Sequence, residues 1–84
     1  MTIQENWALP LARIEAYLQG LEQARRIAEA RYEVCGCEVE LQPLEESKVG
    51  CYAFPRTLVT IFGEEEAVAR FRRQFTIRFL TLGG

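Results

Sequence analysis

The sequence predicts an α+β domain built as a two-layer sandwich, with two helices on one face of a mixed sheet. Residues Tyr32–Gln42 alternate with a period of two, as a strand does, whereas apolar residues in Glu64–Phe75 recur at helical spacing. The β-rich runs Thr57–Phe62 and Thr76–Leu82 flank this helix closely, at about the minimum separation for a parallel crossover. The predicted element order is α-β-β(-β)-α-β.

Composition limits the chain to a single domain, residues 1–84, with one modest core. A chain of 84 residues buries only roughly 60–65% of its unfolded surface. Ten basic and twelve acidic residues leave a net charge of −2, which provides no bulk attraction to nucleic acid or to an anionic membrane. Three cysteines cannot all pair within the chain, and its first residues lack a secretion signal. We therefore expect a cytoplasmic, reduced protein without a membrane-spanning helix.

A long first helix is predicted from Pro10 to about Arg31. Pro10 fits the first turn, where its missing N–H costs nothing, and Gly20 in the middle costs roughly 1 kcal/mol relative to alanine. Such a helix is long enough to span the predicted sheet. The apolar positions at three- and four-residue steps are Leu11, Ile14, Leu18, Leu21, Ala24 and Ala28.

The middle of the chain predicts a hairpin. The strand Tyr32–Gln42 places Cys35 and Cys37 on its apolar face. Pro43–Gly50 is polar and ends in glycine, so it predicts the hairpin connection. β-strand character resumes at Cys51–Phe54.

The last part of the chain predicts strand, helix and strand. Pro55 is hard to place in a central strand, so we expect a turn or an edge bulge there, with Thr57–Phe62 continuing in the same direction. Gly63 is the predicted N-cap of the helix Glu64–Phe75, whose glutamates begin it. Thr76–Leu82 is the predicted last strand. The resulting pattern is partly ferredoxin-like, because the leading strand of that fold is missing.

The predicted partner surface is the sheet face that carries no helix. Several large apolar residues would lie there beside the acidic residues of the first strand. Two interpretations remain open: these residues are covered within the chain, by the Trp7 segment or in a central strand, or they form a dimer or partner surface. The predicted partner-binding residues are Tyr52, Phe54, Leu58, Phe62, Arg78, Leu80 and Leu82.

Few side chains are suited to catalysis or metal binding. The sequence contains no histidine and no aspartate, which excludes Ser–His–Asp and Cys–His arrangements and histidine-containing metal sites within this chain. We predict no catalytic residue and no cofactor. The alternative is a thiolate site for a soft metal at Cys35, Cys37 and Cys51, although core packing of the cysteines is favoured over it.

A basic cluster and the chain end complete the candidate features. Arginines alternate with phenylalanines in a pattern that an RNA surface can use, which makes RNA binding a minority alternative. The terminal Gly83–Gly84 resembles the activated tail of ubiquitin-like sulfur carriers, which can enter an adenylating enzyme. That resemblance covers two residues, and those folds open with a β-hairpin, so an ordinary chain end is the favoured interpretation. The basic cluster consists of Arg70, Arg72, Arg73 and Arg78.

Together these features predict a small, non-catalytic protein-interaction module: an adaptor, an assembly factor, or an inhibitor or regulator of a larger protein. The expected partner is another protein or a second copy of the chain, because nothing indicates a small-molecule substrate or a membrane. A homodimer would form through the sheet face or edge.

Overall fold

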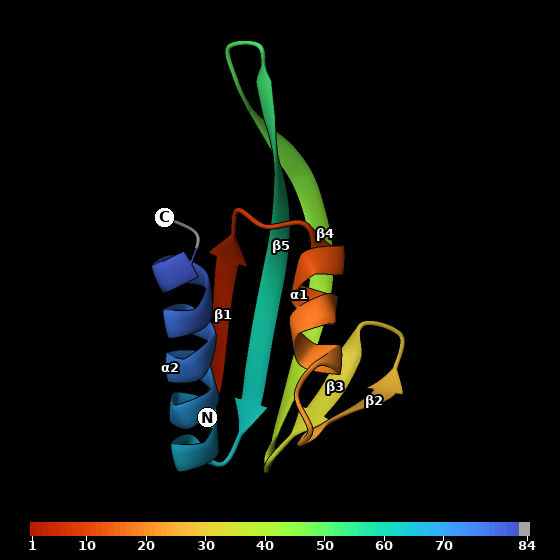
Figure 1. The fold of residues 1–84 in the computed structure, drawn as a ribbon, viewed down its shortest axis with the longest axis vertical. Coiled ribbons are helices and arrows are strands. Elements are labelled where there is room, and N and C mark those ends of the chain that lie inside the picture. The colour runs from red at the N-terminus through yellow and green to blue at the C-terminus, as the bar shows by residue number, and fades with distance from the viewer. Residues whose placement is uncertain (83–84) are drawn as a thin grey trace.

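The structure, a computed structural model, describes the backbone of residues 1–82 and the side chains of residues 1–79. A five-stranded sheet packs against two helices in this part of the chain (Figure 1). The α+β class is therefore confirmed, but the predicted element order is wrong. The elements are β1 (Thr2–Trp7), α1 (Leu11–Gln19), β2 (Ala24–Ala28), β3 (Arg31–Val34), β4 (Cys37–Val49), β5 (Tyr52–Gly63) and α2 (Glu65–Leu82).

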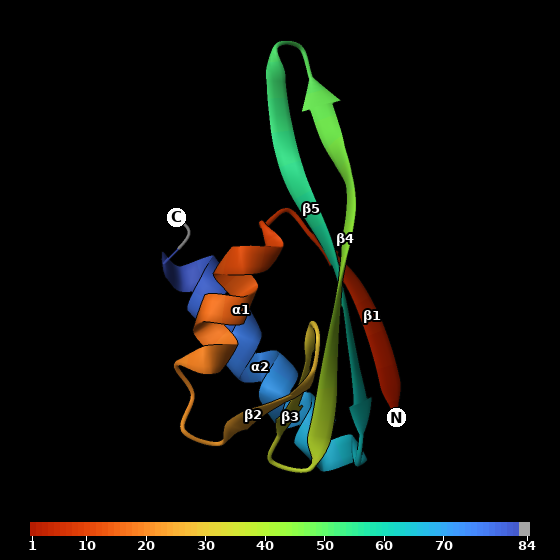
Figure 2. The same cartoon turned by 90° about the vertical axis from the view of Figure 1, so that its right-hand side faces the viewer.

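The sheet has the strand order β1-β5-β4-β3-β2, and every neighbouring pair is antiparallel. The predicted mixed sheet and its parallel crossover are therefore wrong, and no ferredoxin-like strand order is present among residues 1–82. Both helices lie on one face of the sheet, as predicted (Figure 2). The residues that fill the core between these layers include Ile14, Leu18, Tyr32, Val39, Val59, Ile61, Val68, Phe71 and Phe75.

Residues 76–82 form the end of α2 instead of the predicted strand. Their β-branched and aromatic residues favour a strand locally. Phe71, Phe75 and Phe79, however, are spaced four residues apart and so lie on one face of a helix. Phe75 is 1% exposed and packs edge-on against Trp7 and Tyr17. Packing of this face against β1 and α1 outweighs the local strand preference.

The first helix is less than half as long as predicted. Pro10 precedes α1 as predicted, but Gly20 caps its C-terminus and residues 24–28 form β2. Leu18 is buried, whereas Ile27 is 41% exposed, so the apolar repeat past Gly20 does not mark a continuous helix face.

The chain also opens with a strand, β1, that was not predicted. Ile3, Glu5 and Trp7 alternate toward the helices, while the residues between them are exposed.

Two tight turns organise the middle of the sheet. Cys35 and Gly36 both have positive φ, 42° and 89°, which matches the type I′ turn that joins antiparallel strands. The predicted strand Tyr32–Gln42 is therefore split into β3 and the start of β4. The predicted connection Pro43–Gly50 is wrong as well, because β4 continues to Val49 and turns at Gly50.

Both prolines in the long hairpin occupy tolerated positions. β3 pairs with β4 only as far as Glu40, so Pro43 lies where β4 has β5 as its single neighbour. Opposite Pro55 the register shifts, and two β4 residues, Glu45 and Glu46, face one residue of β5. The predicted irregularity near Pro55 is present, as a bulge in the opposite strand. The direction of β5 continues through it, as expected.

Candidate functional site

The predicted partner surface is divided between two sides of the molecule. Tyr52, Phe54, Leu58 and Phe62 occupy alternate positions of β5 and therefore share its helix-free face. Arg78 belongs to α2, on the opposite side of the sheet, so the prediction that it joins this face is wrong. Leu80 and Leu82 also lie within α2 instead of a strand, and their side chains are outside the described part of the structure.

The helix-free face is mainly polar over the body of the sheet. Leu58 and Phe62 are half-buried there, and their cross-strand neighbours are Asn6 and Gln42 for Leu58 and Thr2 and Glu38 for Phe62. No continuous apolar patch therefore covers this part of the face.

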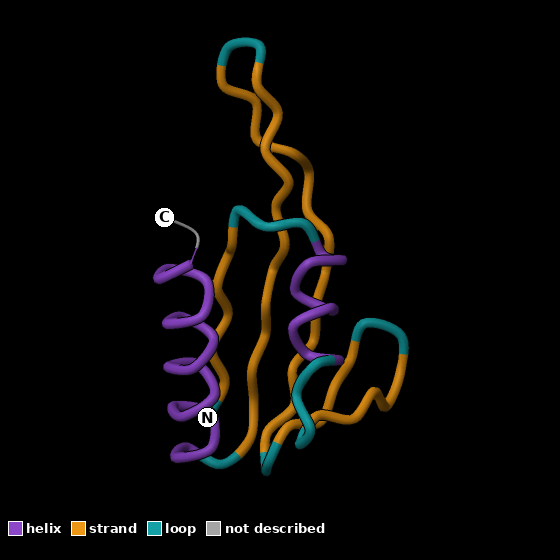
Figure 3. The backbone as a smooth tube through the Cα atoms, in the orientation of Figure 1, coloured by secondary structure: helices purple, strands orange, loops and turns teal. Residues whose placement is uncertain are grey.

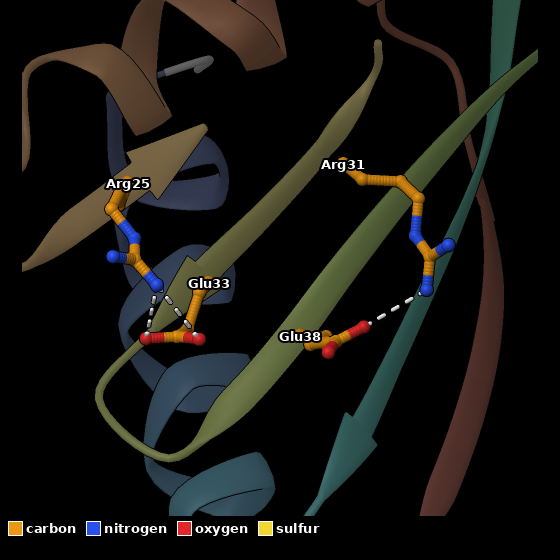
Figure 4. A network of polar contacts seen from close by, with 4 residues as sticks. All are labelled: Arg25, Arg31, Glu33 and Glu38. Atoms are coloured by element: carbon orange, nitrogen blue, oxygen red, sulfur yellow. Dashed lines mark hydrogen bonds and ion pairs between the residues drawn. The ribbon is translucent and has the colours of Figure 1, made fainter. Parts of the chain in front are cut away.

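Two ion pairs lie on the helix-free face where β2, β3 and β4 are neighbours. Arg31 binds Glu38 at 3.0 Å, and Arg25 lies 3.5 Å from Glu33 (Figure 4). Each pair links neighbouring strands, and each is partly exposed, so it contributes about 1 kcal/mol at most. Their main effect is to keep this part of the sheet polar.

The far end of the β4–β5 hairpin, residues 44–56, is here called the arm. It extends beyond the helices and the other strands (Figures 1 and 3) and accounts for the elongated shape, 41 × 27 × 24 Å. Val49, Tyr52 and Phe54 are 64%, 69% and 44% exposed. Val49 pairs with Tyr52 across the strands, and the Tyr52 and Phe54 rings lie 6.5 Å apart, so these three side chains share one face.

Backbone geometry and hydrogen bonds hold the arm in place. Gly50 has a φ of 62° at the first position of its two-residue turn, where glycine avoids the cost of a left-handed backbone. At the base of the arm, the Arg56 guanidinium donates to Ser47 at 2.8 Å and to Asn6 at 3.3 Å. Next to it, the buried Thr57 hydroxyl donates to the Leu9 carbonyl at 2.7 Å. The arm is thus tied to β1 and to the segment that follows it.

The three cysteines do not form the alternative metal site. Cys35 is exposed in the β3–β4 turn, whereas Cys37 is buried and its thiol donates to the Val34 carbonyl at 3.0 Å. Burial, with a smaller contribution from Cys35, raises the pKa of Cys37. Cys51 is exposed in the turn between the end of β4 at Val49 and the start of β5 at Tyr52, whereas Cys37 begins β4 at the other end of the hairpin. Among residues 1–79, no three His, Cys, Asp or Glu side chains are grouped as metal ligands.

The basic cluster lacks the exposed rings that the RNA alternative requires. Phe71 and Phe75 are 2% and 1% exposed and belong to the core, so bases cannot stack on them. Arg72 is engaged by Glu5, with contacts of 2.7 and 3.1 Å, and this contact raises the pKa of Arg72. The arginines on α2 therefore lie on a helix whose aromatic side faces inward.

Two features of this surface were missed from the sequence. Val49 and the Gly50 turn belong to the arm, although their segment reads as a polar loop. The signal that could have located them is Val49-Gly50-Cys51-Tyr52, a glycine-containing two-residue turn between β-forming residues. The free edge of β1 was missed because that strand was not predicted.

A family model supplies the remaining evidence. Residues 5–84 match the family described as archaeal MoaD-like protein, and no curated protein matches the chain. No helix within residues 1–82 is both long and apolar enough to cross a membrane. Because the match spans nearly the whole sequence, this chain belongs to the archaeal MoaD-like family, and the match supports a small protein of the sulfur-carrier type.

Proposed function

We propose that this chain is a non-catalytic, carrier-like module that works by docking on a larger protein, and that the arm is its docking surface. The observation that carries the proposal is the exposed side of the arm, where Val49, Tyr52 and Phe54 share one face. Large apolar side chains that share one exposed face are typical of interaction sites.

The energetics of the arm also support docking. A two-stranded ribbon without a layer packed on it is marginally stable in water, and the arm is such a ribbon. Burial of an aromatic side chain stabilises a complex by roughly 1.5–3 kcal/mol, and tyrosine is frequent among the residues that dominate binding. Tyr52 and Phe54 are therefore the expected anchors, and the partner is expected to offer an apolar groove.

The proposed absence of catalysis follows from the available side chains. A chain without histidine lacks the commonest general base, which leaves glutamate as its main candidate for such a role. The one buried thiol, Cys37, has a raised pKa, which disfavours the reactive thiolate. The chemistry is therefore assigned to the partner.

Affinity capture with matched variants tests this proposal. The tagged chain and the double variant Tyr52→Ser/Phe54→Ser are incubated with a lysate of the source organism, and retained proteins are quantified by mass spectrometry. Ile27→Ser is the control, since Ile27 is an exposed apolar residue of β2 outside the arm. We expect a partner that is retained by the parent chain and the control but falls at least about ten-fold with the double variant. Equal retention by all three would refute the arm as the docking surface.

The second candidate function is sulfur transfer through Gly83–Gly84, and the observation that favours it is the family match, which extends to residue 84. In such a reaction the terminal carboxylate attacks the α-phosphorus of ATP and releases pyrophosphate, and hydrosulfide (HS⁻) as the sulfur donor then attacks the acyl carbon of the adenylate, displaces AMP and leaves a thiocarboxylate. This function requires a free carboxylate at Gly84.

Intact-mass analysis of the protein purified from its source tests the second candidate. Exchange of one oxygen for sulfur at Gly84 would support sulfur transfer. A chain that continues past Gly84, or a terminal carboxylate that stays unmodified after incubation with ATP, a sulfur donor and the captured partner, would refute it.

A further inference from the structure

The outer edge of β1 carries an unpaired row of backbone groups. Met1 and Gly63 exchange two hydrogen bonds, of 2.9 and 3.0 Å, between their backbone groups. Because bonded and non-bonded pairs alternate along an antiparallel ladder, Ile3, Glu5 and Trp7 bond to β5. The N–H and C=O groups of Thr2, Gln4 and Asn6 therefore point away from the sheet.

The two edges of the sheet differ in how they are protected. β2, at the other edge, has a register shift between Arg26 and Ala28, and bulges of this kind discourage pairing with another strand. β1 pairs with β5 over six residues without any register shift. An inward-pointing charge, which also protects edges, is present at Glu5, but Arg72 neutralises it. The β1 edge is thus regular and open.

A groove of about 770 Å³ runs between this edge and α2. Met1 and Ile77, which are 58% and 55% exposed, line it together with Ile3 and Ala69, so much of its surface is apolar. Arg73 also lines the groove and makes no ion pair within the part of the chain that the structure describes. The groove therefore combines apolar contacts with one free cation.

We propose that β1 and this groove bind an extended segment of a partner protein as a sixth strand. The segment would alternate apolar and polar residues, with the apolar side chains in the groove and an acidic side chain against Arg73. Strand addition of this kind supplies affinity through backbone hydrogen bonds and specificity through alternate side chains. The site is separate from the arm, and the inference goes beyond the proposed function.

Charge argues against a second copy of this chain as the occupant. Antiparallel pairing of two β1 edges would place the two-fold axis near Gln4. Gln4 and Arg73 line the same groove, so this axis would place the Arg73 side chains of both copies in one shared groove. Like charges in close approach oppose association, whereas an acidic segment is attracted.

Amide hydrogen exchange with a synthetic peptide tests the inference. The probe has the sequence Thr-Val-Thr-Glu-Thr-Val-Thr, with lysine in place of glutamate in one control and with alternate amides N-methylated in another. We expect the amides of Gln4 and Asn6 to exchange at least about ten-fold more slowly when the glutamate peptide binds. The amides of Ile3 and Glu5, already bonded to β5, should change little. The N-methylated peptide should have no effect.

Variants of the chain locate the contact. Gln4→Pro removes one outward N–H and should weaken binding about five-fold or more, while Ile27→Ser, on β2 at the other edge of the sheet, should leave binding unchanged. Arg73→Glu should weaken the glutamate peptide roughly five-fold and strengthen the lysine peptide. Circular dichroism of each variant checks that it folds.

Three outcomes would overturn the inference: no slowing at Gln4 with saturating peptide, equal binding of the N-methylated peptide, or slowing at Gln4 that follows protein concentration without peptide. The last would identify a second copy as the occupant. The arm variant Tyr52→Ser/Phe54→Ser should bind the peptide normally, so failure of this inference and failure of the proposed function are distinguishable.

Discussion

Replacement of Ile77 by alanine tests whether residues 76–82 are helical. In this segment the structure differs most from the prediction made from the sequence. In a strand, Ile77 and Phe79 would share the inward face, and Ile77→Ala would cost about 2–5 kcal/mol of unfolding free energy. In α2, Ile77 is 55% exposed while Phe75 and Phe79 pack together with their ring centres 4.8 Å apart. The exposed substitution should therefore change stability by no more than about 0.5 kcal/mol. A slight gain is consistent with the higher helix propensity of alanine.

The matched substitution is Phe75→Ala on the same helix. Phe75 is 1% exposed, and four aromatic rings surround it at centroid distances of 4.8 to 6.0 Å. Truncation to alanine removes buried apolar area and leaves a cavity in place of the ring. It should therefore lower the free energy of unfolding by about 3–5 kcal/mol.

Equilibrium urea unfolding of the parent chain and both variants measures these changes as shifts in midpoint at constant slope. A loss above about 1.5 kcal/mol for Ile77→Ala would refute the helical assignment. A loss below about 1 kcal/mol for Phe75→Ala would contradict the burial of its ring against Trp7 and Tyr17.

Three further predictions concern the sheet. Gly63→Ala should cost at least about 2 kcal/mol of stability in thermal unfolding, because the glycine has a φ of 146° and a Cβ there would lie 2.7 Å from a backbone oxygen. The control is Gly20→Ala, which should be nearly neutral because a Cβ at Gly20 would make only ordinary van der Waals contacts. Thr57→Val should cost about 1–3 kcal/mol in urea unfolding because it leaves the Leu9 carbonyl unpaired, whereas Thr57→Ser should retain the bond. Because burial raises the pKa of Cys37 above 9.0, its contribution to stability is complete below about pH 9 and is lost as the pH rises through the folded-state pKa. The free energy of unfolding, measured with urea across this pH range, should therefore fall less steeply with rising pH in Cys37→Ala than in the parent chain. An equally steep fall in both would contradict the raised pKa of Cys37.

The candidate site was predicted in part. Tyr52 and Phe54 were selected from their β-strand character, and they lie on the exposed side of the arm with Leu58 and Phe62 on the same strand face. Whether they bind a partner remains a prediction. The sequence places Arg78 on this face only if residues 76–82 form a strand, and they form the end of α2. A strand places every second residue on the same face, whereas a helix places residues three or four positions apart on the same face. A segment read with the wrong period is therefore predicted on the wrong side of the sheet.

What the sequence by itself determined is the pattern within each short segment. The alternation around Val59 and the helical repeat through Phe71 were correct because each depends on neighbours within a few residues. The class of the domain and the shared face of its helices follow from these patterns.

Only the tertiary structure decided where the elements end and how they pair. α2 continues past Phe75 because the ring of Phe75 packs between Trp7 of β1 and Tyr17 of α1. These contacts join residues more than fifty positions apart, and no local pattern encodes them. The free edge of β1 exists for the same reason, since its pairing with β5 exposes Gln4 to a partner. Contacts distant in the sequence thus decide both the fold and the surface that it leaves open.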